Sequence, residues 1–266
     1  IIDPETRFQT MEGWGGHFYP QAWPYFSESF EREILQELQT THARIRSYWY
    51  RMEYRNDNDD PYSIDWTVFR EGDNGLVRDE LLMQQLLHRR GVKLMFAAFR
   101  FPFWMIGESS DWRPSPDDKP PLPEGMDAEF VESIFAHLVY AWMHYDIVFE
   151  AVSMANEPDI GIYIKGLDPD RLIRLARDLR DRLQAVGYPM PQFYLPDVAA
   201  ADPITREYVK DFFATDGWQG LTRSFSYHSY RREMPIIRYY AELAGRHGLP
   251  EGVQGGAFLV MCGLWP

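Results

Sequence analysis

The segment from Ala151 to Pro158 (Ala-Val-Ser-Met-Ala-Asn-Glu-Pro) joins an apolar run to a carboxylate. The run predicts a buried strand, and Glu157 follows it directly, between the amide of Asn156 and the ring of Pro158. α/β barrels carry their catalytic groups at the carboxyl ends of their strands, which makes Glu157 a candidate general acid or base. The structural alternative is that Asn-Glu-Pro only forms the turn that ends a strand.

Short apolar runs alternate along the chain with segments that carry apolar residues at three- and four-residue spacing. The order indicates repeated βα units, of which about seven are visible. We therefore predict an α/β fold of the (β/α)8-type TIM barrel, formed by residues 1–266 as one domain. Strands are expected at Gly13 to Tyr19, Ala43 to Tyr50, Val92 to Phe99, Phe149 to Ala155, Gln192 to Val198 and Leu221 to Tyr230, with a seventh from near Gly252.

Four helices are expected around residues 30–38, 81–87, 130–142 and 172–183. Asp168-Pro169 and Asp202-Pro203 mark helix starts, because Asp caps free amides and Pro fits the first turn. The stretch from Trp112 to Glu124 holds five prolines and predicts a long loop after the third strand.

Composition excludes several classes of partner. A formal net charge of −13 argues against nucleic acid, which needs a basic face, and no basic amphipathic segment suits a membrane surface. No apolar run is long enough to span a bilayer. The first residues contain no signal peptide, and a mature secreted chain would look the same. The single Cys262 leaves the redox compartment open.

Five short motifs, in order, resemble the clan A retaining glycoside hydrolases, most closely the family 30 group of glucosylceramidases and xylanases. Each motif alone is common, but together they span most of the chain. They are the opening strand Phe8 to Phe18, Ile45-Arg46, Phe101-Pro102-Phe103-Trp104-Met105, Val152 to Pro158, and Tyr227-His228-Ser229-Tyr230.

The resemblance implies a glycosidase on β-linked glycans, with Glu157 as general acid/base and a carbohydrate as partner. It implies no cofactor and no metal, and it favours a secreted or periplasmic location. Arg46 would keep a catalytic carboxylate ionised, the alternative being a salt bridge at the edge of the core. His228 is otherwise a core histidine, and the tryptophans are otherwise packing residues. The expected substrate-binding residues are Asn156, Arg46, Trp14, Trp104, His228 and Tyr230.

The second carboxylate is the point at which the sequence departs from the resemblance. A retaining mechanism needs it about 5–5.5 Å from the first, and the family carries it at the end of the seventh strand. Here Glu251 follows Pro250 directly and falls where that strand begins, while Gln254 is nearer the expected place but is an amide. Glu251 is the candidate that we name; Glu53 and Asp197 are possible substitutes.

The segment after Gly256 is short and mostly apolar, enough for one strand. Eight complete βα units would need roughly 30 more residues. Three explanations are open: a truncated or frame-shifted hydrolase, an incomplete barrel whose open side a second copy covers in a homo-oligomer, or a barrel that has lost hydrolysis and kept sugar binding. An uncovered open side would expose strand edges and apolar core surface.

The missing nucleophile leaves a carbohydrate-binding pseudoenzyme as the main alternative to a glycosidase. An unrelated aldolase or metal-dependent hydrolase is disfavoured, because no His-x-His pair ends the first strand and no strand carries a Schiff-base lysine.

Overall fold

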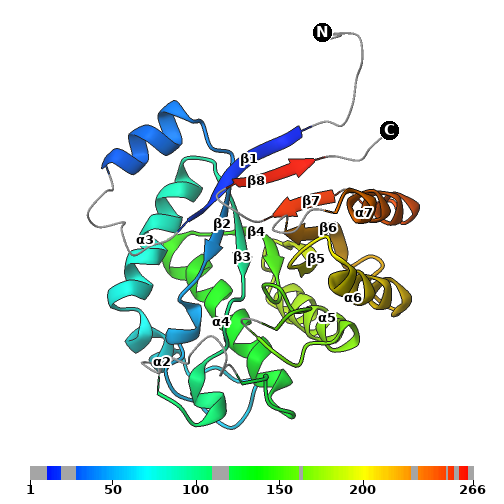
Figure 1. Cartoon of the computed structure of the whole chain (residues 1–266). Coiled ribbons are helices and arrows are strands. Elements are labelled where there is room, and N and C mark those ends of the chain that lie inside the picture. Colours follow the sequence, from blue (N-terminus) through cyan, green and yellow to red (C-terminus); the bar gives the residue numbers. More distant parts are fainter. Residues whose placement is uncertain are drawn as a thin grey trace.

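The computed structural model describes residues 11–18, 28–109, 120–161, 164–228, 233–249, 251–254 and 258–262. The described strands form a closed ring in the order β1 to β8, and the helices lie outside it (Figure 1). The strands are β1 (Met11–Phe18), β2 (His42–Arg46), β3 (Lys93–Ala97), β4 (Phe149–Ser153), β5 (Gln192–Val198), β6 (Thr222–His228), β7 (Glu251–Gln254) and β8 (Phe258–Cys262).

Helices connect successive strands up to β7, as the alternating pattern predicts. Their order is η2 (Glu31–Glu37), η3 (Trp49–Arg51), α2 (Trp66–Gly72), α3 (Gly75–Arg89), η4 (Phe103–Ile106), α4 (Asp127–Tyr145), α5 (Pro169–Ala185), α6 (Pro203–Ala214) and α7 (Met234–Arg246). The two predicted caps are confirmed: Asp168 accepts a hydrogen bond from the Arg171 amide at 2.8 Å, and Asp202 accepts one from the Thr205 amide at 2.9 Å. Most of the proline-rich loop falls outside the described residues.

The strands from β1 to β7 are parallel, and β8 pairs antiparallel with both β7 and β1. Only three residues separate β7 from β8, so no helix lies between them. The expected (β/α)8-type plan, incomplete at its C-terminal end, is confirmed. The prediction that one side of the barrel is open is wrong for the described strands, because β8 pairs with both β7 and β1 and closes the ring. The unpaired edge that led us to expect a covering second copy is therefore not found there.

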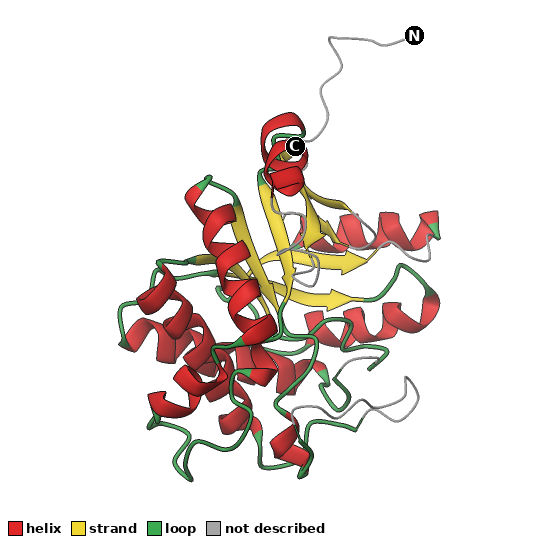
Figure 2. Cartoon of the chain, turned by 90° about the vertical axis from the view of Figure 1, so that its left-hand side faces the viewer, coloured by secondary structure: helices red, strands yellow, loops and turns green. Residues whose placement is uncertain are grey.

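Alternation along the strands separates an outer core from the inside of the ring. Helices lie against the outside of the strands (Figure 2). Ala43 and Ile45 of β2 are fully buried in the large apolar cluster of the protein. Arg44, between them, points the other way. Lower in the ring, one residue each from β3, β4 and β5 forms a separate small apolar cluster: Met95, Ala151 and Tyr194. The upper part of the ring is polar, which is unusual for a core and points to a site.

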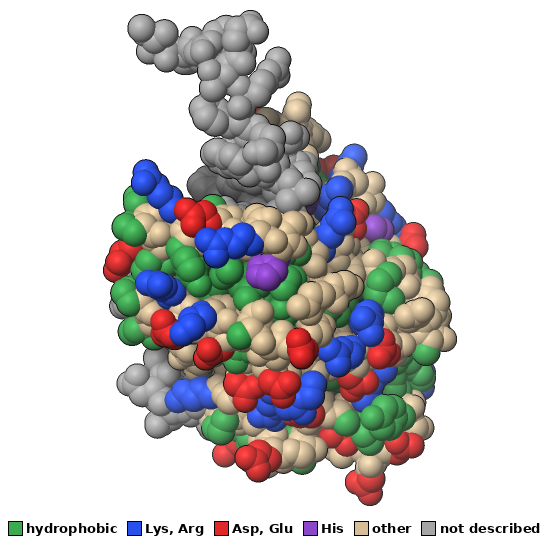
Figure 3. All heavy atoms as spheres, turned by 90° about the vertical axis from the view of Figure 1, so that its right-hand side faces the viewer, with side chains coloured by type: hydrophobic (Ala, Val, Ile, Leu, Met, Phe, Trp, Pro, Cys, Tyr) green, Lys and Arg blue, Asp and Glu red, His purple; other side chains and the backbone are tan. Residues whose placement is uncertain are grey.

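The face that carries α5, α6 and α7 shows acidic and basic side chains intermixed (Figure 3). Ion pairs one turn apart join them, including Arg174–Asp170 at 3.0 Å on α5 and Arg246–Glu242 at 3.6 Å on α7. The acidic excess therefore does not form a single anionic patch on this face. Among the described residues, no helix has the length and apolar character needed to cross a membrane.

Candidate active site

Glu157 lies just beyond the carboxyl end of β4, where the chain turns across the top of the ring. The Asn156 amide donates to the carbonyl of Ala98 at 2.8 Å, and the Glu157 amide donates to the carbonyl of Asp197 at 3.0 Å. Both Glu157 and Asp197 have left-handed backbones, with φ of 54° and 60°. Such conformations cost of order 1–3 kcal/mol in a non-glycine residue and concentrate at functional sites. The two acids are therefore held at this point by the surrounding structure.

His228, at the end of β6, lies between the two carboxylates. Its Nδ1 is 2.6 Å from Oε1 of Glu157, and its Nε2 is 3.2 Å from Oδ1 of Asp197. All three side chains are buried. Burial lowers the pKa of His228, but the hydrogen bonds to Asp197 and Glu157 outweigh it, and the net effect raises this pKa above its ordinary value. The imidazole thus joins the ends of β4, β5 and β6.

Arg44 fixes the charge of Asp197. Its Nη2 donates to Oδ2 of Asp197 at 2.8 Å and to Oδ1 of Asn156 at 2.7 Å. Ser153 of β4 donates to the same Asp197 oxygen at 2.6 Å. Burial raises the pKa of Asp197, but the Arg44 charge and the hydrogen bonds from His228 and Ser153 hold it well below its usual range. Asp197 is therefore an anion with no exposed surface.

These contacts fix the number of protons in the centre. Since Asp197 is ionised, Nε2 of His228 must carry a hydrogen and donate it to Asp197. The remaining contact, between Nδ1 and Glu157, holds one more proton, on either partner. With that proton on His228 the pair is imidazolium and carboxylate; with it on Glu157 the pair is neutral. The Glu157–His228 pair therefore stores one transferable proton at the mouth of the barrel.

A second group of side chains from β1, β2 and the end of β3 lies beside this centre. The ring of His17 stacks on that of Phe99 at 5.4 Å. The guanidinium carbons of Arg44 and Arg46 lie 4.9 and 5.2 Å from the Phe99 ring centroid. Burial and the charges of Arg44, Arg46 and His228 lower the pKa of His17 to about 3, so His17 is neutral.

The loops that carry the two acids are tied to each other by Asp159. Its Oδ1 accepts the Ala199 amide at 2.9 Å, and its Oδ2 accepts the Thr205 hydroxyl at 2.8 Å. Asp159 follows β4, whereas Ala199 follows β5 and Thr205 begins α6. This connection keeps the turn at Glu157 in register with Asp197.

The residues predicted from the sequence fall at different places. Asn156 and His228 lie in the centre with Glu157. Arg46 is on the same side of β2 as Arg44, but the bonds to Asn156 and Asp197 come from Arg44, which we did not single out. The alternation at positions 42, 44 and 46 was the signal that could have found it. Tyr230 lies outside the described residues.

The two tryptophans differ in position. Trp104 lies in η4 after β3, half-buried against the outer core. Trp14 lies in the middle of β1, three residues before His17, and its amide donates to the Thr41 hydroxyl at 2.9 Å. Three strand residues cover about 10 Å, so Trp14 is well below the level of Glu157. His17 is the β1 residue that reaches the centre, and its place at the strand end was the signal we missed.

None of the three proposed second acids has the position of a retaining nucleophile. In the β6–β7 register Gln254 pairs with His228, whereas Glu251 pairs with Phe225, about 10 Å earlier along the strand. Asp197 is separated from Glu157 by the His228 ring and is fully buried. Glu53 is hydrogen-bonded to Ser133 of α4 and belongs to a different cluster.

No family model and no curated protein sequence matches the chain. Solved structures do match its fold. The family 30 subfamily 8 xylanase Xyn30A from Clostridium acetobutylicum is 13% identical, with a TM-score of 0.58, over 92% of this chain and 55% of that one. An endo-β1,6-glucanase is 13% identical, with a TM-score of 0.66, over 95% and 58%. A family 39 β-xylosidase from Caulobacter crescentus is 16% identical, with a TM-score of 0.57, over 95% and 56%.

The chain therefore has the fold of the clan A glycoside hydrolases, and the resemblance seen in its motifs is confirmed as a likeness of fold. It spans a little over half the length of these structures.

Proposed function

We propose that the chain is a glycoside hydrolase that cleaves β-linked glycans with Glu157 as its general acid/base. The observation that supports this most is the 2.6 Å contact between Oε1 of Glu157 and Nδ1 of His228 at the carboxyl end of a barrel strand. Protonation of a glycosidic oxygen requires a positioned carboxyl group with a transferable proton, and a contact with an imidazole can supply one.

Each group has a role in the proposed step. Glu157 delivers its proton to the oxygen of the leaving sugar as the bond to the anomeric carbon breaks. His228 shares that proton through Nδ1 before the transfer. Glu157 then regains a proton from the attacking water as general base. Asp197 and Arg44 touch no substrate in this scheme; they position the imidazole and keep its Nε2 hydrogen in place. Asn156, held by Arg44, is in place to bind a sugar hydroxyl.

The alternative function is carbohydrate binding without hydrolysis, and a specific observation favours it. The residue beside His228 on β7 is Gln254, an amide. Both carboxylate oxygens of Asp197 are already bound by Arg44, Ser153 and His228. A site with one proton donor and no accessible second carboxylate would bind a glycan but would not complete a double displacement.

The test uses the substrates of the structural neighbours: xylan, β-1,6-glucan and an aryl β-xyloside. Wild type is compared with Glu157→Gln and with Glu150→Gln, a control on the same strand whose side chain is exposed and pairs with Lys93 at 3.5 Å. We expect Glu157→Gln to lower kcat by about 10²–10⁴-fold and the control to be unchanged. A dinitrophenyl leaving group needs no proton, so the loss should shrink on a dinitrophenyl β-xyloside.

Three outcomes separate the possibilities. Hydrolysis that falls as described, and recovers with the activated leaving group, supports the proposal. Hydrolysis that Glu157→Gln leaves unchanged would remove Glu157 from the proton-donor role. No hydrolysis by wild type on any of these substrates, combined with binding of xylo-oligosaccharides in calorimetry, would establish the binding function instead.

A further inference from the structure

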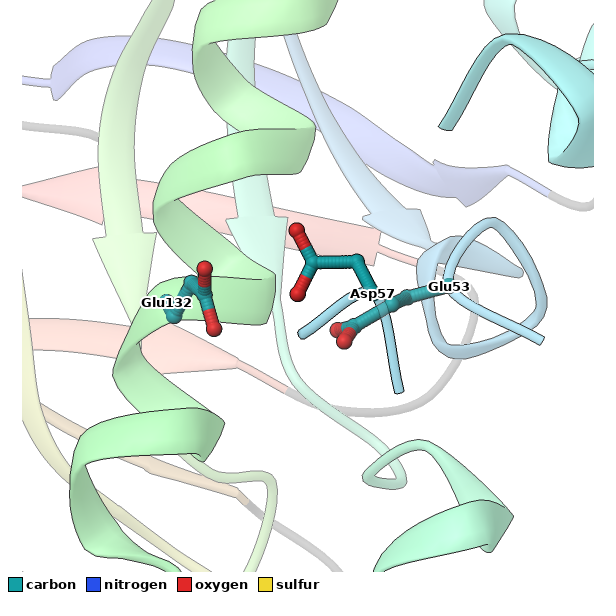
Figure 4. Close-up of side chains that lie close together, drawn as sticks. All are labelled: Glu53, Asp57 and Glu132. Atoms are coloured by element: carbon teal, nitrogen blue, oxygen red, sulfur yellow. The ribbon is translucent and has the colours of Figure 1, made fainter. Parts of the chain in front are cut away.

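Three carboxylates that the proposed catalytic centre does not use converge beside α4. Glu53 and Asp57 come from the loop between η3 and α2, and Glu132 comes from the N-terminal half of α4 (Figure 4). One oxygen from each lies within 4.8 Å of the others. The cluster therefore joins two segments that are far apart in the sequence.

The oxygens that face one another have no protein donor. Glu132 has no exposed surface, and no N–H or hydroxyl donor among the described residues reaches either of its oxygens. The side-chain hydrogen bond that bears on its carboxyl group joins it to another acid, Glu129. Glu53 is 1% exposed. Oε1 of Glu53 and Oδ1 of Asp57 are also buried atoms that no hydrogen-bond donor among the described residues reaches. A buried carboxylate oxygen without a donor costs several kcal/mol when ionised, unless a cation or a proton neutralises it.

The second carboxylate oxygens of Glu53 and Asp57 each accept a hydrogen bond from a neighbouring group, as is common for carboxylates that bind a metal. Oε2 of Glu53 accepts the Ser133 hydroxyl, and Oδ2 of Asp57 accepts the Asp65 amide at 2.6 Å. Such bonds from surrounding groups orient carboxylates and leave one oxygen of each for the ion. Two acids are thus held with their free oxygens toward the third.

The protein supplies little positive charge at this point. The positive charge of Arg182 lowers the pKa of the neighbouring Glu129, but the Arg182 guanidinium is paired with Asp178 at 3.0 Å. Burial, the contact with Glu129 and the surrounding acids raise the pKa of Glu132 to about 10, and burial raises the pKa of Glu53. Without a bound cation, the cluster would have to hold protons at neutral pH.

The ligand type and geometry select among cations. Carboxylate oxygens suit hard divalent cations such as calcium and magnesium. Magnesium requires near-ideal octahedral geometry at about 2.0–2.1 Å, whereas calcium accepts irregular arrangements at about 2.3–2.6 Å. Three oxygens from a loop and a helix, all within 4.8 Å of one another, suit the more tolerant ion and leave room for water in its shell.

We propose that Glu53, Asp57 and Glu132 bind a calcium ion that fastens the loop after η3 to α4. This goes beyond the sequence, from which we predicted no metal. The ion lies apart from the proposed catalytic centre and touches none of its residues. Its role is to hold the segment between β2 and α2 in place, and it is independent of whether the chain hydrolyses glycans.

The test measures calcium binding and thermal stability of the whole chain after treatment with EGTA. Isothermal calorimetry with CaCl2 should show one ion per chain. At a calcium concentration 100 times the Kd, the Tm should rise by about 5 °C or more. Glu132→Gln and Asp57→Asn should abolish both effects. Asp59→Asn removes the same charge from an exposed position in the same loop and should retain both.

The variants also separate calcium from shared protons. If the cluster held protons alone, wild type would neither bind calcium nor gain stability from it, and that result would overturn the proposal. A calcium-dependent Tm shift that persists in Glu132→Gln and Asp57→Asn would overturn it equally. Magnesium that binds more tightly than calcium would refute the choice of ion. In EGTA, Glu132→Gln should fold at least as stably as wild type, since it removes a buried acid.

Discussion

The buried pair of Arg44 and Asp197 allows a quantitative test of the centre. The two side chains are 4% and 0% exposed and 2.8 Å apart. With one proton shared by Glu157 and His228, the four groups sum to zero charge. Asp197→Asn leaves a net positive charge inside the ring, and Arg44→Met leaves a net negative one. The double variant is neutral again.

Breaking a buried ion pair from one side costs about 3–5 kcal/mol, because the partner stays buried and uncompensated. Each single variant should therefore lose about that much unfolding free energy and about 6–20 °C in Tm. The double variant should lose clearly less than the sum, with a coupling energy of about 2–3 kcal/mol. Urea unfolding followed by tryptophan fluorescence at pH 7, with calorimetric melting, measures all four proteins.

The exposed pair Arg174–Asp170 on α5 provides the matched control, with the same residue types at 3.0 Å but 57% and 66% exposed. Arg174→Met and Asp170→Asn should each change the unfolding free energy by no more than about 0.5 kcal/mol. If the Arg44 and Asp197 losses add within about 0.5 kcal/mol, the charge balance that we assign to the centre is refuted.

Three further predictions concern the scaffold. Burial raises the pKa of the Glu80 carboxyl group from 4.5 to about 7 in the folded protein. The folded state therefore binds the carboxyl proton more tightly than the unfolded state does. The resulting contribution to the unfolding free energy is complete below pH 4.5 and is lost as the pH rises to about 7. Glu80→Gln should remove that slope and exceed wild type by up to about 3 kcal/mol at pH 8 in urea titrations, and an unchanged slope would contradict this. A Cβ on Gly15 would lie 1.7 Å from the His42 carbonyl oxygen, so Gly15→Ala should lower the unfolding free energy by more than about 4 kcal/mol. A Cβ on Gly245 would have nothing within 4 Å, so Gly245→Ala should raise the unfolding free energy slightly in the same urea titrations. Asp168→Ala should cost about 1 kcal/mol by removing a helix cap, and an unaltered Tm would argue against that cap.

The sequence predicted the strands well, because alternation and strand-ending residues are local signals. The expected strand from Gln192 to Val198 matches β5 residue for residue, and the others agree within a few residues. The short α2 and the helix α7 were missed, since neither is announced by an Asp-Pro start. The close contact between Gly15 and β2 was not predictable, because it depends on which strand packs beside β1.

The centre was predicted only in part. Glu157, Asn156 and His228 came from motifs, and the structure brings them together. Arg44 and Arg46 lie two residues apart on the same side of β2. Sequence spacing alone does not decide which of them reaches across the ring to Asp197, and the structure shows that it is Arg44. The cluster of Glu53, Asp57 and Glu132 was not predictable from spacing. Its members come from a loop and a helix that meet only in three dimensions.

The seam between β1 and β8 joins the two strands of the ring that are farthest apart in the sequence. Each parallel strand from β2 to β7 joins a neighbour made shortly before it, but β8 joins β1 across almost the whole length of the chain, with Met11 beside Cys262. Contacts of such long separation are entropically the hardest to form. During synthesis, β1 cannot pair along that edge until β8 has left the ribosome. We therefore expect the seam between β1 and β8 to form late, and until then the edge of β1 is a place where another chain's strand could pair instead.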